Sequence, residues 1–140
     1  MILFSSALEL IENINIIMKN LIIDAATDKI LFKIIADKES YTSEFPNDSE
    51  NFDKFAKLLF NFLKENNIKI SDIKNVFINQ GPGKFSGIRT SISIAKALCI
   101  TNSLDLYGFS SDQALDKNYK GIVDLYRDGI LKKNLIKPIY

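Results

Sequence analysis

The stretch INQGPGKFSGIRT, residues 78–90, places glycines, a proline and a lysine between an apolar run and a helical pattern. A glycine-rich phosphate loop occupies this position in many nucleotide-binding proteins. However, Gly81, Gly83 and Gly87 follow a G-x-G-x-x-x-G spacing, one residue wider than the dinucleotide fingerprint. Pro82 also removes one of the amide donors from which an anion site is built. The sequence therefore favours a sharp bend with glycines at positive φ over a phosphate cradle.

A lysine and a serine in the same stretch raise two further interpretations. A Walker loop is excluded because Phe85, and not Ser or Thr, follows Lys84. A Ser-Lys peptidase would need Ser86 to be activated by Lys84 or Lys96. Ser86 as the N-cap of the next helix, with solvated lysines, is the more common arrangement.

Several kinds of catalysis are excluded by composition. The chain has no histidine, so Ser-His-Asp and Cys-His sites cannot form, and a metal would have to bind carboxylates, carbonyls or one thiol. That thiol, Cys99, is the single cysteine, which rules out an internal disulfide and predicts a reducing compartment, the cytoplasm. Its position among Ala and Ile in a helical pattern predicts buried packing over reactivity.

Size and charge indicate one ordinary globular domain. The chain has 140 residues, with 18 basic and 17 acidic side chains that give a formal net charge of +1. No overall field would draw it to nucleic acid or to an anionic membrane. Lys132, Lys133 and Lys137 form a small basic tail, which we interpret as solvated surface.

The first residues are apolar but interrupted by acids and asparagines, so they predict neither a signal peptide nor a membrane span. Two interpretations of residues 1–17 stay open. In the first, they are an amphipathic helical extension or a stretch upstream of the true start at Met18. In the second, they form an additional helix that covers an otherwise bare face of the domain.

Apolar runs and turn residues predict an α/β domain with a mixed five-strand sheet and flanking helices. The expected strands cover residues 19–24, 30–36, 39–45, 71–80 and 104–110, and the expected helices cover 48–67 and 85–101. The tail LKKNLIKPIY is not assigned to any element.

Both expected helices carry wide apolar arcs. The arc of the first spans roughly 200° at about 100° per residue, more than one sheet covers. Such a helix can simply be well buried, but the pair can also meet another protein. On that second interpretation, the expected contact residues are Phe52, Phe55, Leu59, Arg89, Ser93 and Lys96.

Residues 18–111 resemble the TsaB (YeaZ) family of tRNA threonylcarbamoyladenosine synthesis. The resemblance is carried by KNLIIDAATDKILFKII, by the Phe-rich helix, and by SDIKNVFINQGPGKFSGIRTSISIAKAL with LYGFSS. The family usually reads G-P-G-S-F-T-G-L-R in its glycine-proline block. Gly81, Pro82, Gly83, Phe85, Gly87 and Arg89 match that block, Ser86 is conservative, and Lys84 departs from it.

The resemblance implies an actin-like, hexokinase-like (ribonuclease H-like) half and a non-catalytic role. It implies a heterodimer with the transferase TsaD, the ATPase TsaE joining that complex, tRNA contact only through the complex, and a homodimer when the chain is alone. No cofactor is expected, because the turn after Asp24 lacks the glycine of nucleotide-binding relatives. Residues 112–140 are then a remnant of the family's second domain, in a shortened form of the protein. The enzyme alternative is a glycoprotease-like peptidase or a small ATP-binding actin-like enzyme.

Overall fold

The computed structural model describes residues 19–115, 118–133 and 135–140. The expectations for residues 1–17 lie outside this part of the chain. The strands are β1 (Lys19–Asp24), β2 (Lys29–Ile35), β3 (Ser40–Pro46), β4 (Ile73–Asn79), β5 (Asp105–Phe109) and β6 (Lys132–Lys133). The helices are α2 (Ser49–Phe52), α3 (Phe55–Glu65), α4 (Phe85–Asn102) and α5 (Lys120–Arg127), with 3₁₀ turns η1 (Ile70–Asp72) and η2 (Ser111–Ala114).

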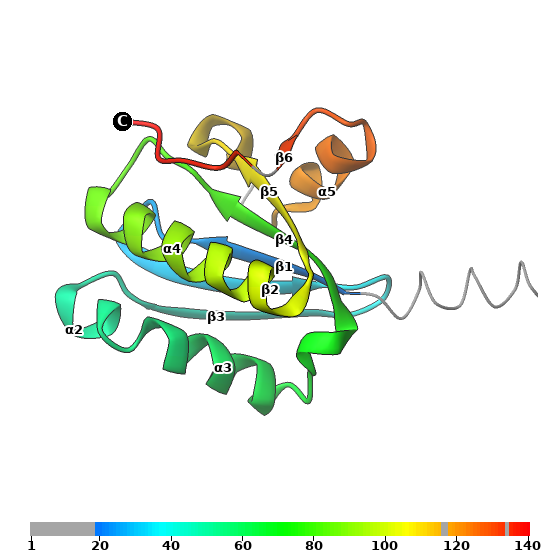
Figure 1. The fold of residues 1–140 in the computed structure, drawn as a ribbon, viewed down its shortest axis with the longest axis horizontal. Coiled ribbons are helices and arrows are strands. Elements are labelled where there is room, and N and C mark those ends of the chain that lie inside the picture. Colours follow the sequence, from blue (N-terminus) through cyan, green and yellow to red (C-terminus); the bar gives the residue numbers. More distant parts are fainter. Residues whose placement is uncertain (1–18, 116–117, 134) are drawn as a thin grey trace, which may run out of the picture.

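The strands form one mixed sheet in the order β3-β2-β1-β4-β5-β6 (Figure 1). The chain first makes an antiparallel meander of β1, β2 and β3. It then adds β4 and β5 parallel to β1 through helical crossovers. The predicted α/β class and mixed sheet are confirmed. The expected five strands become six because the unassigned tail contributes β6, which pairs antiparallel with β5.

Two layers of helix cover the sheet. α3 and α4 lie on one face and α5 lies on the other (Figure 1). The alternation of side chains along β1 explains this arrangement, because Leu21 and Ile23 point to the α3–α4 core while Ile22 points to the α5 core. All three side chains are fully buried, so the strand contributes to both cores at once.

The predicted helix over 48–67 is divided in two. Asp48 accepts a hydrogen bond from the Asn51 amide at 3.0 Å and so caps the single turn α2. α3 then begins at Phe55, which packs edge-on against Phe32 of β2 at 5.4 Å between ring centroids. The division therefore places the first aromatic ring of α3 in the core.

Candidate docking face and glycine-proline loop

The glycine-proline loop joins the end of β4 to the start of α4. Gly81 has a φ of +104° and is followed by a cis bond to Pro82. The backbone at this point requires glycine, because an L side chain rarely adopts that φ. Gly83 and Gly87 do not have the positive φ that was expected of them, and they are needed for a different reason. A Cβ at either position would collide with a carbonyl of the β1–β2 turn, so these glycines allow α4 to approach that turn closely.

Neighbouring segments hold the loop in place and occupy its polar groups. The Gly81 amide donates to the Asn79 side chain at 2.8 Å, and the Lys84 amide donates to the Ala26 carbonyl at 2.7 Å. Ser111 donates its hydroxyl to the Pro82 carbonyl at 2.7 Å. The Gly81 and Lys84 amides are already hydrogen-bonded and Pro82 has no N–H, so the loop has few donors left for an anion. This geometry supports the interpretation of a rigid bend.

The start of α4 differs from the expectation. Its N-cap is Lys84, which makes no side-chain capping bond, and Ser86 lies exposed within the first turn. The Lys84 ammonium donates to the carbonyl of Asn47, not to a serine. The predicted Ser86 cap is therefore wrong, because the N-cap lies two residues earlier, at Lys84, whose side chain binds the Asn47 carbonyl.

A buried polar network, which was not predicted from the sequence, lies where β1 and β4 end. One carboxylate oxygen of Asp24 accepts from the Ala26 amide at 3.1 Å and from the Asn79 amide group at 3.0 Å. The other oxygen accepts the Tyr119 hydroxyl at 2.7 Å. Burial, followed by the Asp24 charge, raises the pKa of Tyr119. The network joins β1, β4 and the start of α5, and its three donors occupy the carboxylate.

A sequence signal for this network did exist. Asp24 and Asn79 each end an apolar run, LIID and VFIN, and the carboxyl ends of parallel strands meet at one edge of a sheet. Tyr119 carries no such signal, because it reaches Asp24 from 95 positions away in the sequence.

The C-terminal tail runs back along the same edge of the sheet (Figure 1). Ile139 donates its amide to the Gln80 carbonyl at 2.7 Å, and Gln80 donates its side chain to the Lys137 carbonyl at 2.9 Å. The Tyr140 ring lies 5.2 Å from the Phe85 ring, centroid to centroid. The tail therefore packs on the glycine-proline loop and on the first turn of α4.

Cys99 lies inside the core, as predicted. Its side chain faces the sheet from α4 and is 6% exposed. Burial, and secondarily the Asp105 charge, raises the pKa of the thiol to about 12. At neutral pH the thiol is therefore protonated and a poor nucleophile.

The helices expected to meet a partner lie side by side, and they expose a strip that runs mainly along α4. Two of its aromatic side chains, Phe60 and Phe85, are 46% and 50% exposed, and Ile100 is 82% exposed. We define the α3–α4 outer face by Phe60, Phe85, Arg89, Ser93, Ala97 and Ile100.

The expected contact residues divide between this face and the interior. Arg89 and Ser93 are exposed and line one hollow on α4, and the Arg89 guanidinium lies 5.1 Å from the Phe85 ring centroid. Phe52 and Lys96 are half-buried. Phe55 and Leu59 require a correction, since the structure places them 1% and 0% exposed in the core. They point to the sheet because the inner side of α3 has to cover β1 and β2.

Within the described ranges, no helix has the length and apolarity to cross a membrane, and no group of three or more His, Cys, Asp or Glu side chains is placed to hold a metal ion.

Comparisons with known proteins agree on the family. Residues 49–122 match the family model described as TsaD, tRNA N6-adenosine threonylcarbamoyltransferase. A curated relative, the tRNA threonylcarbamoyladenosine biosynthesis protein TsaB of Buchnera aphidicola subsp. Schizaphis graminum, is 30% identical over 91 residues. That match covers 65% of this chain and 43% of the relative.

Solved structures agree on the fold. YeaZ from Pseudomonas aeruginosa superposes with a TM-score of 0.65 and 15% identity, over 80% of this chain and 50% of that one. RuvC of T. thermophilus in complex with a Holliday junction substrate gives a TM-score of 0.54 at 9% identity, over 84% of this chain and 99% of that one. At these identities the likeness concerns the fold alone, and it confirms the ribonuclease H-like, actin-like architecture.

The chain spans about half the length of the TsaB and YeaZ proteins that it matches. The family-model match nevertheless covers more than half of the chain, and the curated relative carries the name to which the glycine-proline block pointed. The chain belongs to the family whose model is described as TsaD, tRNA N6-adenosine threonylcarbamoyltransferase, and within that family it resembles the TsaB (YeaZ) proteins.

Proposed function

We propose that this chain takes part in the synthesis of threonylcarbamoyladenosine in tRNA, at the adenosine next to the anticodon, as a non-catalytic partner of TsaD. The name of the curated relative supports the pathway. The observation that carries the partner role is the α3–α4 outer face, which keeps Phe60, Phe85 and Ile100 exposed and holds the Arg89 guanidinium against the Phe85 ring. Exposed apolar and aromatic side chains around an arginine are the composition of many protein interfaces.

In this proposal TsaD binds the α3–α4 outer face and TsaE joins the resulting complex. When the chain is alone, a second copy covers the same face, because a two-fold axis lets one patch serve both subunits. The net charge of +1 gives the isolated chain little attraction for RNA, so tRNA is reached through the complex. The cytoplasm is the expected location, since tRNA is modified there.

The enzyme alternative receives less support from the geometry. Three donors hold the Asp24 carboxylate, and Lys84 is directed to the Asn47 carbonyl and away from a role as base for Ser86. The raised pKa of Cys99 keeps its thiol protonated. A peptidase that used Lys84 or Cys99, or a nucleotide site that used Asp24, would need that group to be free.

The test is binding of TsaD to the full chain and to two variants, measured by calorimetry and by co-elution in size-exclusion chromatography. Ile100→Asp places a charge on the outer face, whereas Leu115→Asp does the same after η2, at a side chain of nearly equal exposure, 83% against 82%. We expect the first variant to weaken binding by about tenfold or more, since burying an unpaired charge at a contact costs at least 1.4 kcal/mol. The control should bind as the wild type does.

Each result decides a part of the proposal. No complex at micromolar concentrations would refute the partner role. A complex that Ile100→Asp leaves unchanged would refute the assigned face and keep the role. Light scattering of the isolated chain tests the homodimer, and a monomer mass at all concentrations would remove it.

A further inference from the structure

β3 forms one edge of the sheet, and its outer side is unpaired. It pairs with β2 along all seven of its residues, and among the described residues no strand lies on its other side (Figure 1). Burial alternates along it, because the even-numbered residues 40–46 are exposed and the odd-numbered residues between them are half-buried. An edge strand of this length presents a row of free backbone groups to which another strand can pair.

Two hydrogen bonds at the ends of β3 show which of its backbone groups are free. The Asn47 amide donates to the Asp28 carbonyl at 3.0 Å, and the Ala36 amide donates to the Glu39 carbonyl at 3.0 Å. Both bonds continue the register of β2 and β3, and hydrogen-bonded positions alternate along an antiparallel pair. The odd-numbered residues of β3 therefore bond to β2. The residues whose amides point outward are Ser40, Thr42 and Glu44.

The outer side of β3 is complementary to itself. When two copies pair antiparallel about a two-fold axis at Ser43, Thr42 faces Glu44 of the second copy, and each donates its amide to the other's carbonyl. Tyr41 then faces Phe45 of the second copy at a position without hydrogen bonds, where side chains lie closest. Both rings pack on the α3–α4 core and are half-buried, so this pairing covers the part that is left exposed. Aromatic cross-strand pairs of this kind stabilise a sheet.

Charges on the other face of the strand fit the same pairing. The Lys33 ammonium donates to the Thr42 hydroxyl at 3.3 Å, so its charge lies over β3. Glu44 is the charged residue of β3, and it is exposed. Because Glu44 of the second copy faces Thr42, its carboxylate comes within reach of Lys33, and the two-fold axis repeats this ion pair. The match of charges favours a second copy over an unrelated strand.

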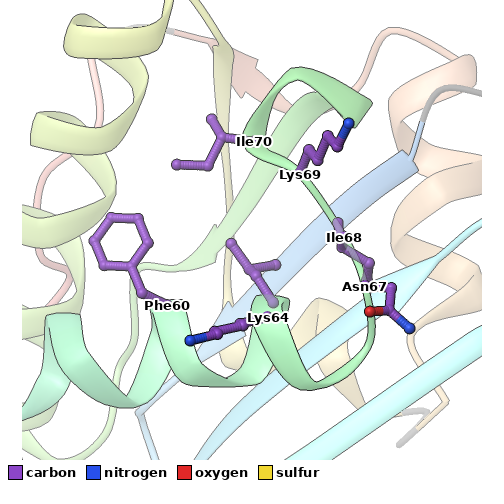
Figure 2. A pocket seen from close by; sticks show the side chains of 7 residues that line it. Phe60, Lys64, Asn67, Ile68, Lys69 and Ile70 are labelled. Carbon is purple, nitrogen blue, oxygen red and sulfur yellow. The ribbon is translucent and has the colours of Figure 1, made fainter.

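We propose that two copies of the chain pair through β3, antiparallel about Ser43, and join their sheets into one continuous sheet. This contact is separate from the α3–α4 outer face. The hollow between the last turns of α3 and η1 belongs with that outer face, because Phe60 lines it together with Lys64 and Ile70 (Figure 2). Its lining comes from α3, η1 and the loop between them. A pair joined through β3 therefore keeps both outer faces open for TsaD.

The test uses the full chain with Ile100→Asp, so that self-association through the outer face does not contribute. Analytical ultracentrifugation over a range of concentrations should show a weak monomer–dimer equilibrium, because a contact of one strand is small. Thr42→Pro, added to this background, takes away an outward amide and no bond to β2, so the dimer dissociation constant should rise by about tenfold or more. Thr42→Val keeps the amide and is the matched control, which should change that constant by less than about threefold.

Exchange of the charges tests the register in the same background. Glu44→Lys brings like charges together across the joint and should weaken the dimer several-fold. Lys33→Glu combined with Glu44→Lys reverses the ion pair and should restore the dimer. A double variant that stays as weak as Glu44→Lys alone would overturn the pairing about Ser43.

Amide hydrogen exchange gives a readout that needs no variant in β3. In the Ile100→Asp chain, exchange at Thr42 and Glu44 should slow as the protein concentration rises, whereas exchange at Ser43, which bonds to β2, should change little.

Three results would overturn the inference. The first is a monomer at every concentration up to millimolar, and the second is a dimer that Thr42→Pro leaves unchanged. The third is protection of the Thr42 and Glu44 amides that appears only when TsaD is added, which would assign the edge to a strand of TsaD. The measurements on the isolated chain do not depend on TsaD binding, so failure here and failure of the TsaD contact are distinguishable.

Discussion

Removing one hydroxyl, in Tyr119→Phe, should destabilise the domain more than its loss of mass suggests. Tyr119 is 7% exposed and Asp24 is 6% exposed, and the hydroxyl donates to the carboxylate at 2.7 Å. A hydrogen bond to a charged group contributes about 1.5–3 kcal/mol, and the substitution leaves a buried carboxylate oxygen without this donor. The ring itself stays against Phe109, so little packing is lost. We therefore expect the free energy of unfolding to fall by about 2 kcal/mol.

The assay is urea unfolding of the wild type, Tyr119→Phe, Asp24→Asn and the double variant. If hydroxyl and carboxylate act as a pair, the double variant loses less stability than the two single variants together, with a coupling of about 1 kcal/mol or more. Tyr126→Phe is the control, because that ring packs on Phe77 in the same core. A loss below about 0.5 kcal/mol with no coupling would refute the account of the network.

Two further predictions concern α4 and its surroundings. Gly83→Ala should lower the free energy of unfolding by about 1–3 kcal/mol, because the added Cβ would collide with the Ala26 carbonyl. Gly121→Ala in α5 has no atom within 4 Å of the added Cβ, so it should be neutral or stabilising by about 0.5 kcal/mol. Thermal melts of both variants check this. The Cys99 pKa, raised from 9.0 to about 12, predicts a pH dependence, since the unfolded state loses the thiol proton first as the pH rises. The stabilisation from the protonated Cys99 thiol is complete below pH 9.0 and is lost toward pH 12, at up to about 1.4 kcal/mol per pH unit. The free energy of unfolding of Cys99→Ala should therefore fall less steeply with pH in that window than that of the wild type. Equal slopes for the two proteins would contradict the assigned burial.

Local patterns predicted most of the fold. Runs such as LIID and VFIN are short and apolar and are bounded by turn residues, and they became β1 and β4. The apolar arc of α4 was also correct, with Ile88, Ile92 and Ala95 buried against the sheet. In these segments burial and secondary-structure period agree, so the sequence is sufficient.

Long-range contacts were the part that local patterns could not supply. The bond from Tyr119 to Asp24 depends on where α5 packs, and no spacing in the sequence encodes it. The tail is a similar case, because LIKPIY has no helical or strand period. Its order comes from Gln80, which holds it at two backbone positions.

The wide apolar arc of α3 shows why a partner surface is hard to locate from periodicity. The sequence left two explanations of that arc open, full burial or contact with a partner, and the structure shows that α3 lies against both the sheet and α4. Phe55 and Leu59 pack on the sheet, Ala56 is half-buried where α3 faces α4, and Phe60 is left exposed. The exposed apolar surface therefore moves to Phe60 and to the α4 strip that ends at Ile100, where a single charge can test the proposed contact without disturbing the core.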